Sequence, residues 1–406
     1  MENLPAHSPL GASGAARWLK CAGSVGLSEG IEDAESDFAA LGTAAHVLLE
    51  TCLTEKQPAW KRTGQFIWRD EVGPQQKGVG LMDGAIPVDA DMANAVQVMI
   101  DAIDEAHPER DQGNSWIERK FHCPDIHPLF YGTADFVYYD ETNSTVHVWD
   151  YKHGAGIVVE AENNVQTMYY AAGALTDLGL WDTVDTVVLH IGQPRGWHYE
   201  GPIREWAIST DDLDAWIGDV LVPGMDYALL HDETYAAEHC RFCAVRLRAC
   251  PALDEKVDRL KELYEMADKK GGIQKMSNAR LGELINLEVI TKIKFKAARD
   301  VAFGRANAGK KVPGTKLVKA RSNRVWKEGV EKKAKAAMGA AAYTKPKLKS
   351  PSEIEKLPKG AAFVEANAFK PDTGLTLVAD DDRRREVSRD TKAGFKPVKK
   401  SFRKSK

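Results

Sequence analysis

Two aspartates and a lysine lie close together in one predicted β-hairpin. Asp135 ends the tetrapeptide GTAD, and Asp150 and Lys152 are two residues apart near the end of the next predicted strand. Because side chains alternate between the two faces of a strand, Asp150 and Lys152 face the same side. Hard divalent cations prefer carboxylate oxygens, and a nearby ammonium group adds positive charge where phosphodiester hydrolysis gathers negative charge. The pattern predicts such a hydrolytic site, although an isolated Asp-X-Lys is more often a surface ion pair.

Two predicted helices carry further polar residues that can act at such a site. Gly42, His46 and Glu50 recur every four residues, so they share one helix face. The His46 imidazole is a good ligand for Mn²⁺, but a histidine beside a solvated glutamate is also common without a metal. Gln166 and Tyr170 share a helix face in the same way. They can hold a nucleic-acid backbone or orient the lysine, or they can serve only the packing of their helix.

The periodicity of the chain predicts the elements that position these residues. Alternating, β-branched and aromatic residues predict three strands joined as an antiparallel meander, over 115–122, 132–139 and 145–152. Two more strands are predicted near 184–191 and 198–207. Helices are predicted over 13–22, 36–55, 89–106, 162–178 and 211–230, with a loop or insertion over 58–84. We therefore expect an α/β (α+β) core, in which a mixed sheet is flanked by helices.

In chain order, these motifs resemble the PD-(D/E)xK nuclease superfamily, in particular its RecB-like branch. The matching motifs are a G-x-x-x-H-x-x-x-E helix, a G-x-x-D strand, a D-x-K strand and a Q-x-x-x-Y helix, followed by QPR at 193–195. The resemblance implies a restriction-endonuclease-like core that binds Mg²⁺ or Mn²⁺. The implied metal ligands are His46, Asp135, Asp150 and the Tyr151 carbonyl. The implied catalytic set is Asp135, Asp150, Lys152, Gln166, Tyr170 and Glu50, with Lys152 assisting the attacking water.

The cysteines add a second resemblance. Cys240, Cys243 and Cys250 crowd into eleven residues, and Cys21 precedes the predicted core. This arrangement is similar to AddB-type and CRISPR-associated RecB-like nucleases, in which four thiolates hold a [4Fe-4S] cluster. The resemblance implies such a cluster here, closing a loop of more than two hundred residues. The last spacing is one residue longer than in those relatives, and Zn²⁺ or ordinary thiols are the alternatives.

The remaining two cysteines, Cys52 and Cys123, are predicted to be buried small apolar residues.

The formal charge of −4 conceals a strong division along the chain. Residues 1–250 contain 16 Lys and Arg against 39 Asp and Glu, whereas residues 251–406 contain 39 against 20. Charged helices are predicted over 252–269 and 277–308. Basic side chains neutralise DNA phosphates and release counterions, so the second half is expected to bind DNA. The expected DNA contacts are Lys292, Lys294, Lys296, Arg299, Lys316, Lys319, Arg321 and Arg324.

Composition and motifs together predict four parts. Residues 1–251 form the nuclease domain with the cysteine cluster, and 252–330 form a basic helical region that contacts DNA. Residues 331–387 form a small C-terminal segment. Residues 388–406 carry eight basic residues against one acidic residue and are expected to be disordered when unbound.

A broader resemblance spans nearly the whole chain. The opening SPLGASGAARWLKCAGS, PGTKLVKARSNRVW at 313–326 and SPSEIEKL at 350–357 resemble a phage and prophage family known only as a domain of unknown function. The resemblance implies a phage-encoded protein of DNA metabolism, with a phage single-strand-binding protein and polymerase as partners. With no predicted signal peptide or membrane span, we expect it in the bacterial host cytoplasm.

The leading hypothesis is a Mg²⁺- or Mn²⁺-dependent exonuclease that degrades linear or single-stranded DNA in phage replication or recombination. Two alternatives stand beside it. One is a recombination accessory or scaffold protein that binds DNA without cutting it, and the other is a structure-specific endonuclease.

Overall fold

The computed structural model divides the chain into two compact units, Met1–Thr291 and Lys292–Lys406. It describes residues 5, 7–31, 37–70, 73–77 and 85–319. Beyond these, it describes residues 325–326, 330–344, 347–348, 351–355, 359–369, 375–379 and 387. The predicted tail at 388–406 and the candidate DNA contacts Arg321 and Arg324 lie outside the described residues.

A five-stranded mixed sheet forms the centre of the first unit. Its strands are β4 (Ser115–His122), β5 (Tyr131–Asp140), β6 (Thr145–Tyr151), β7 (Thr186–Gly192) and β8 (Ile203–Ser209), in that spatial order. The pair β6 and β7 is parallel and the other three pairs are antiparallel. The predicted meander and the two later strands are therefore confirmed as parts of one sheet.

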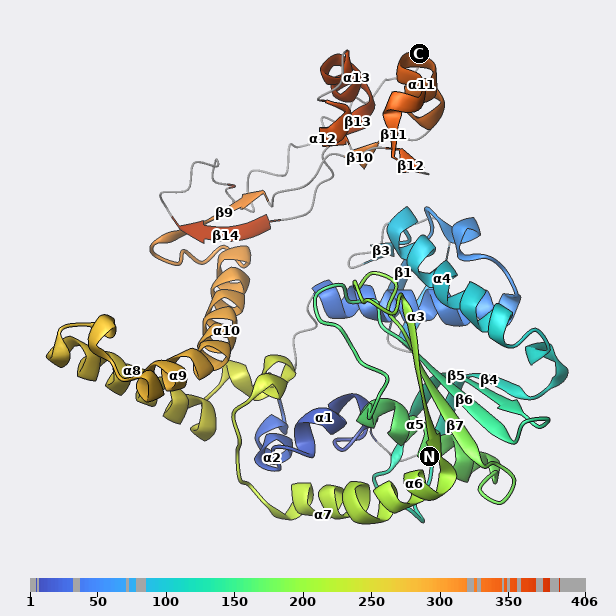
Figure 1. Cartoon of the computed structure of the whole chain (residues 1–406), viewed down its shortest axis with the longest axis horizontal. Coiled ribbons are helices and arrows are strands. Elements are labelled where there is room, and N and C mark those ends of the chain that lie inside the picture. Colours follow the sequence, from blue (N-terminus) through green and yellow to red (C-terminus); the bar gives the residue numbers. More distant parts are fainter. Residues whose placement is uncertain are drawn as a thin grey trace, which may run out of the picture. The chain divides into compact units, whose positions relative to one another are not determined.

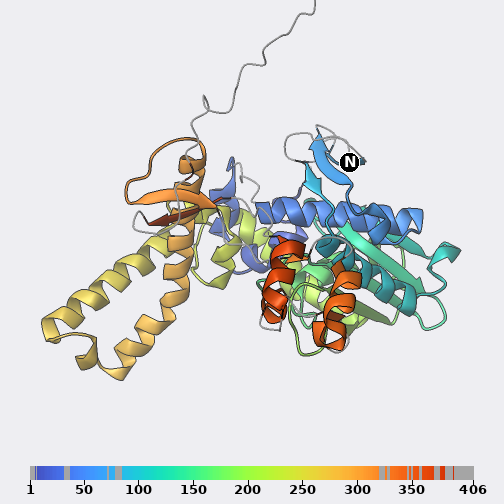
Figure 2. The same ribbon diagram turned by 90° about the horizontal axis from the view of Figure 1, so that it is seen from above.

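Helices cover both faces of this sheet (Figure 1). The crossover helix α5 (Val165–Leu178) packs on β4, β5, β6 and β7, because its buried side chains join Val137, Val148 and Leu189 in one hydrophobic cluster. The helices α3 (Asp37–Glu55) and α4 (Ala90–Ala106) pack on the opposite face (Figure 2). Their hydrophobic cluster includes Phe136 and Trp149 of the sheet. The expected mixed sheet flanked by helices is confirmed.

Short helices near the start of the first unit pack against a segment more than 190 residues later. The predicted single helix over 13–22 is instead α1 (Ala15–Trp18) followed by α2 (Gly23–Ser28), and α2 contacts α7 (Val222–Leu230). Gly23 lies against this later segment so closely that a Cβ atom there would lie 2.2 Å from the Asp232 carbonyl oxygen. The Gly23 N–H donates to the Glu233 carbonyl at 2.9 Å. The helix predicted over 211–230 consists of α6 (Thr210–Trp216), a π-helical turn (Ile217–Leu221) and α7.

The loop predicted over 58–84 is wrong in part. This region contains a 3-10 helix (Ala59–Arg62) and the antiparallel pair β1 (Phe66–Asp70) and β2 (Gly73–Lys77), and β1 also pairs with β3 (Ile86–Pro87). The Gly, Pro and Gln content of the segment favoured a loop, but Ile67 is buried in the same hydrophobic cluster as α3 and α4. Tertiary packing therefore stabilises strands that local composition does not predict.

The first unit ends with α8 (Pro251–Lys270) and α9 (Asn278–Asn286), which pack through Leu263, Ala267 and Leu287. The next helix, α10 (Glu288–Asn307), continues into the second unit.

The second unit contains the antiparallel pair β9 (Thr315–Lys319) and β14 (Leu375–Ala379). It also contains α11 (Val330–Met338), α12 (Pro351–Ile354) and α13 (Gly360–Asn367), whose small core includes Ala334, Ile354 and Val364. Two short pairs complete its described strands, β10 (Val325–Trp326) with β13 (Ala368–Phe369), and β11 (Tyr343–Thr344) with β12 (Lys347–Leu348). The division of the chain into four parts, predicted from composition and motifs, stays a prediction.

Candidate active site

Asp135 and Asp150 meet at the end of the β5–β6 hairpin, and both side chains are buried. Regular pairing of β5 with β6 ends at Phe136 and Trp149. Just beyond that point, the Tyr151 N–H donates to Asp135 Oδ2 at 2.8 Å. The carboxylate thus replaces the strand partner that this backbone donor lacks, and the hydrogen bond fixes Asp135 beside the strand that carries Asp150.

His46 reaches the same carboxylate from α3. Its Nδ1 atom lies 3.3 Å from Asp135 Oδ2, and its side chain is one-third exposed. The predicted neighbour Glu50 is exposed one turn further along α3, where its negative charge still acts on the site. Gly42 lies one turn earlier and is half-buried, and apart from its own helical turn no described part of the chain lies within 4 Å of the position where a Cβ would be.

Lys152 is held by two oxygen atoms on the other side of the hairpin end. Its Nζ atom lies 2.8 Å from Asp150 Oδ2 and donates to Gln166 Oε1 at 2.7 Å. The amide nitrogen of Gln166 donates to the Tyr170 hydroxyl at 2.9 Å and lies 3.4 Å from Asp150 Oδ1. The predicted residues Asp150, Lys152, Gln166 and Tyr170 are therefore joined in one hydrogen-bonded network.

The start of α5 positions Gln166 in this network. Asn164 caps the helix, and its side-chain oxygen accepts from the N–H groups of Gln166 and Thr167. An asparagine cap satisfies backbone donors that have no partner inside the helix, so it sets where the helix begins. Since Gln166 and Tyr170 are four residues apart, both side chains then face Asp150 near the end of β6.

Glu118 on β4 is a site residue that the sequence did not reveal. A ligand atom from each of Glu118, His46 and Asp135 lies within 4.8 Å of the others. Glu118 lies opposite Asp135, because Ile117 pairs with Phe136 and Arg119 pairs with Ala134. Its φ of 47° is in the left-handed region, which a glutamate adopts only at a cost of about 1–3 kcal/mol. The register of two strands, rather than any local motif, would have been the signal for this residue.

The charges at the site set its protonation. Burial lowers the pKa of His46, but the negative charges of Asp135 and Asp150 outweigh burial and raise this pKa to about 9. Burial and the charge of Asp135 raise the pKa of Glu118 to about 8. Burial also raises the pKa of Asp150, whereas the charge of His46 and the Tyr151 hydrogen bond overcome burial and lower the pKa of Asp135. At neutral pH, protons on His46 and Glu118 therefore offset charge among three crowded carboxyl groups.

This set of donor atoms fits a divalent cation. Carboxylate oxygens with one imidazole suit Mg²⁺ or Mn²⁺, and a cation would replace the two protons as the source of positive charge. His46, Glu118 and Asp135 are close enough to share it. Asp150 is not in this group of three, but its charge interacts with those of Asp135 and His46.

The predicted Gln193 and Arg195 organise the loop that follows β6. Gln193 is buried, and its amide donates to the carbonyls of Gly154 and Ile157 at 2.8 and 2.6 Å. Arg195 donates to the His153 carbonyl at 3.1 Å. These residues therefore support the chain next to Lys152 and act on the site through the loop.

The four cysteines implied to hold a cluster lie together. All four are buried, and the thiol of Cys240 is close enough to those of Cys21, Cys243 and Cys250 for their charges to act on it. The Tyr235 N–H donates to Cys21 Sγ at 3.4 Å. Cys52 and Cys123 are also buried, and each belongs to a different hydrophobic cluster of the sheet.

Among the described residues, the two groups of three or more His, Cys, Asp or Glu with ligand atoms within 4.8 Å of one another do not include this cysteine set. Sulfur atoms on a single tetrahedral Zn²⁺ would lie about 3.8 Å apart, from a Zn–S distance of about 2.3 Å. In any three of these four described cysteines, at least one pair of sulfur atoms therefore lies farther apart than 4.8 Å.

The predicted DNA contacts lie in the second unit. Lys292, Lys296 and Arg299 are spaced by four and three residues on α10 and share one face, whereas Lys294 falls on the opposite side of the helix. Lys316 and Lys319 lie on β9, where Lys319 is exposed and Lys316 is half-buried. The structure therefore groups three of these contacts on one helix face.

No helix within the described part of the chain is long and apolar enough to cross a membrane. A family model described as a protein of unknown function, DUF2800, matches residues 7–385. No solved structure matches the chain.

Proposed function

The chain belongs to the DUF2800 family, whose description assigns no activity, and we therefore propose its function from the candidate site. We propose that it is a Mg²⁺- or Mn²⁺-dependent deoxyribonuclease of the PD-(D/E)xK type, which acts as an exonuclease on linear or single-stranded DNA. The observation that carries the proposal is the convergence of Asp135, Asp150 and Lys152 at one hairpin end. The order and spacing of the motifs, which resemble the RecB-like branch, support the same proposal.

In this proposal, His46, Glu118, Asp135 and Asp150 hold the cation, and the Tyr151 carbonyl is a further ligand. The bound cation supplies positive charge for the scissile phosphate and lowers the pKa of the attacking water. Glu118 extends the ligand set implied by the motifs.

Lys152 then positions the nucleophile. An ammonium group has three N–H donors: one donates to Gln166, and the positive charge lies 2.8 Å from Asp150 Oδ2. A remaining N–H can donate to the attacking water or to a phosphate oxygen. Because Gln166 is itself fixed by Tyr170, the ammonium is held in place before the substrate binds, which lowers the cost of reaching the transition state.

We propose further that Cys21, Cys240, Cys243 and Cys250 hold a [4Fe-4S] cluster. Four buried thiols brought together from distant parts of the chain support this assignment, and so does the resemblance of their sequence spacing to that of RecB-like nucleases. The cluster would join α1 and α2 to the segment that follows α7. The basic face of α10 is proposed to bind DNA phosphates, since Lys292, Lys296 and Arg299 share it.

The deciding experiment compares Asp150→Asn and Lys152→Met with the wild-type protein on end-labelled linear DNA. Each variant is expected to lose roughly a hundredfold to a thousandfold or more of the Mg²⁺- or Mn²⁺-dependent activity. Asp182→Asn, at an exposed position after α5, is the matched control and is expected to retain activity. Full activity in Asp150→Asn would overturn the proposal.

Two further outcomes separate the alternatives. Cleavage of closed circular DNA at the rate of linear DNA would favour a structure-specific endonuclease. Binding of single strands without any shortening, with Mg²⁺ or Mn²⁺ present, would favour a non-cutting accessory or scaffold protein.

A further inference from the structure

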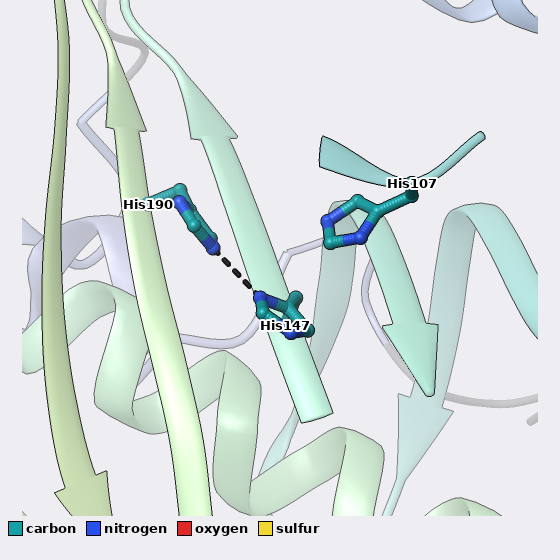
Figure 3. Close-up of side chains that lie close together, drawn as sticks. All are labelled: His107, His147 and His190. Atoms are coloured by element: carbon teal, nitrogen blue, oxygen red, sulfur yellow. Dashed lines mark hydrogen bonds between the residues drawn. The ribbon is translucent and has the colours of Figure 1, made fainter. Parts of the chain in front are cut away.

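Three histidines from separate elements meet on the face of the sheet opposite to Asp150. His147 lies on β6 and His190 on the neighbouring parallel strand β7, while His107 directly follows α4 (Figure 3). A ring nitrogen from each lies within 4.8 Å of the others. The motifs of the proposed nuclease use none of these residues, and Val148 and Asp150 alternate with His147 onto the other face.

The distances between ring nitrogens suit a shared metal ion. His147 Nδ1 and His190 Nε2 are 3.0 Å apart. Two nitrogens bound to one tetrahedral Zn²⁺ at about 2.0–2.1 Å are separated by roughly 3.3 Å. Without an ion, the two nitrogens must share a single hydrogen in this contact. A small outward movement of either ring would open the ligand spacing.

The second nitrogen of His190 is oriented as in many metal sites. His190 Nδ1 is buried and makes no hydrogen bond, and the Oε2 atom of Glu205 lies 3.6 Å away. A carboxylate that receives the outer N–H of a metal-bound histidine fixes the ring and strengthens the ligand. Glu205 on β8 is therefore placed to orient His190 with Nε2 facing His147.

The imidazoles are in the form that metals bind. The Trp149 indole N–H donates to His107 Nε2 at 3.0 Å, so an ion must either replace Trp149 at Nε2 or bind Nδ1 after the ring proton has moved to Nε2. Burial, with the neighbouring imidazole charges, lowers the pKa of His107 to about 3 and the pKa of His190 well below its usual value.

One of the three histidines, His107, also lines a cavity of about 440 Å³, together with Asp104 and Asp111. Its lining also includes Lys56 and Arg110, each paired with Asp111.

We propose that His107, His147 and His190 bind one late divalent transition ion, of the class of Zn²⁺, Co²⁺ or Ni²⁺, as a metal site separate from the nuclease centre. Three imidazoles and no carboxylate ligand suit these ions and not Mg²⁺, which prefers oxygen. The ion would tie the end of α4 to β6 and β7, and so fix the helix layer that includes His46 on α3.

The test counts Zn²⁺ bound to the purified, chelator-treated full chain by equilibrium dialysis. His147→Gln is expected to bind one equivalent fewer than the wild-type protein. The control His7→Gln removes an exposed histidine and is expected to bind the same number as wild type. The cysteines and the nuclease centre are unchanged in both variants, so their binding cancels in the difference. Equal stoichiometry in His147→Gln and wild type would overturn the proposal.

Two further measurements guard against misfolding of the histidine variant. Glu205 is largely exposed, so Glu205→Gln should fold normally, and it is expected to weaken the affinity of this one site roughly 10- to 100-fold. An ion bound to Nε2 of His107 uses the lone pair that accepts from Trp149. An ion bound to Nδ1 leaves the ring proton on Nε2, so Trp149 loses its acceptor in both cases. Zn²⁺ should therefore change the tryptophan fluorescence of the wild type but not of His147→Gln. An unchanged affinity in Glu205→Gln, together with an unchanged fluorescence, would contradict a histidine-bound ion.

Discussion

Replacement of Gly173 by alanine is expected to displace α5 and to disable the candidate site from a distance. Gly173 lies where α5 crosses β4, and a Cβ atom there would lie 2.3 Å from Cε2 of the Phe121 ring. Ordinary contact begins near 3.4 Å, so the helix and the ring must separate by about 1 Å. The ring cannot easily turn away, because it is 1% exposed and packs against Phe130, Tyr169 and Tyr170.

The cost can be worked from these contacts. Overpacking of a dense core costs about 1–3 kcal/mol, and a packed aromatic ring places this case near the upper end. Alanine is favoured over glycine inside a helix by about 1 kcal/mol. The free energy of unfolding of Gly173→Ala should therefore fall by about 2 kcal/mol.

Activity should fall more than stability. A shift of α5 by about 1 Å would stretch the 2.7 Å contact between Gln166 and Lys152 beyond hydrogen-bonding distance. Such a misplacement of a positioning group can reduce a rate about a hundredfold. The assays are urea unfolding and degradation of end-labelled linear DNA under conditions where the variant is folded.

Two further variants test whether crowding between Gly173→Ala and the Phe121 ring causes these losses. Gly282→Ala makes the same change on α9, where no atom lies within 4 Å of the added Cβ, and it should be stabilising by up to about 1 kcal/mol. Phe121→Leu should restore activity to Gly173→Ala by making room for the methyl group, with a coupling of roughly 0.5–3 kcal/mol between the two changes. Wild-type stability and activity in Gly173→Ala would refute the account, and so would a Phe121→Leu change that gives no rescue.

Three other predictions follow from particular residues. Gly42→Ala adds a methyl group in open space on α3, so it should raise the free energy of unfolding by about 1 kcal/mol. It should nevertheless lower DNA cleavage, because the substrate is proposed to pass over the helix face that carries His46. An equally active variant would place the substrate elsewhere. Burial raises the pKa of the Cys52 thiol from 9.0 to about 11. The contribution of the protonated thiol to stability is therefore complete below pH 9, and about 2 kcal/mol of it is lost as the pH rises toward 11. Urea unfolding at pH 8 to 10.5 should show a shallower pH dependence in Cys52→Ala than in the wild type. Cys21→Ser should remove most of the iron and the broad visible absorbance of anaerobically purified protein, whereas the control Cys123→Ser should leave both unchanged. A colourless wild-type protein with bound zinc would instead favour a zinc site.

The parts of the fold with strong local signals could be predicted from the sequence. The meander follows from alternating β-branched residues around the turn formers at 140–144, and α5 follows from a periodic run that begins at the Asn164 cap. Asp135, Asp150 and Lys152 were predicted to meet because a hairpin brings the ends of its two strands together. The structure places their side chains in this way.

Other features depend on contacts between distant segments. Glu118 joins the site only through the register of β4 against β5, and nothing in SWIERKFH distinguishes it from a solvated acid on an alternating strand. The three histidines come from β6, β7 and the end of α4, and no spacing in the sequence relates them. The β1–β2 pair was missed because tertiary burial of Ile67 outweighs a composition that is poor in strand formers.

The close contact between Gly23 and the Asp232–Glu233 backbone has a consequence for synthesis of the protein. The helices α1 and α2 leave the ribosome about 200 residues before α7 and the residues that follow it, and α1 alone has an earlier partner in α5. At about 5–20 residues per second, they wait roughly 10 to 40 seconds for α7. The central sheet can form during this interval, but α2 can complete its packing only after residue 233 has been translated. Nascent chains that stop before residue 230 should therefore leave α2 open to proteolysis.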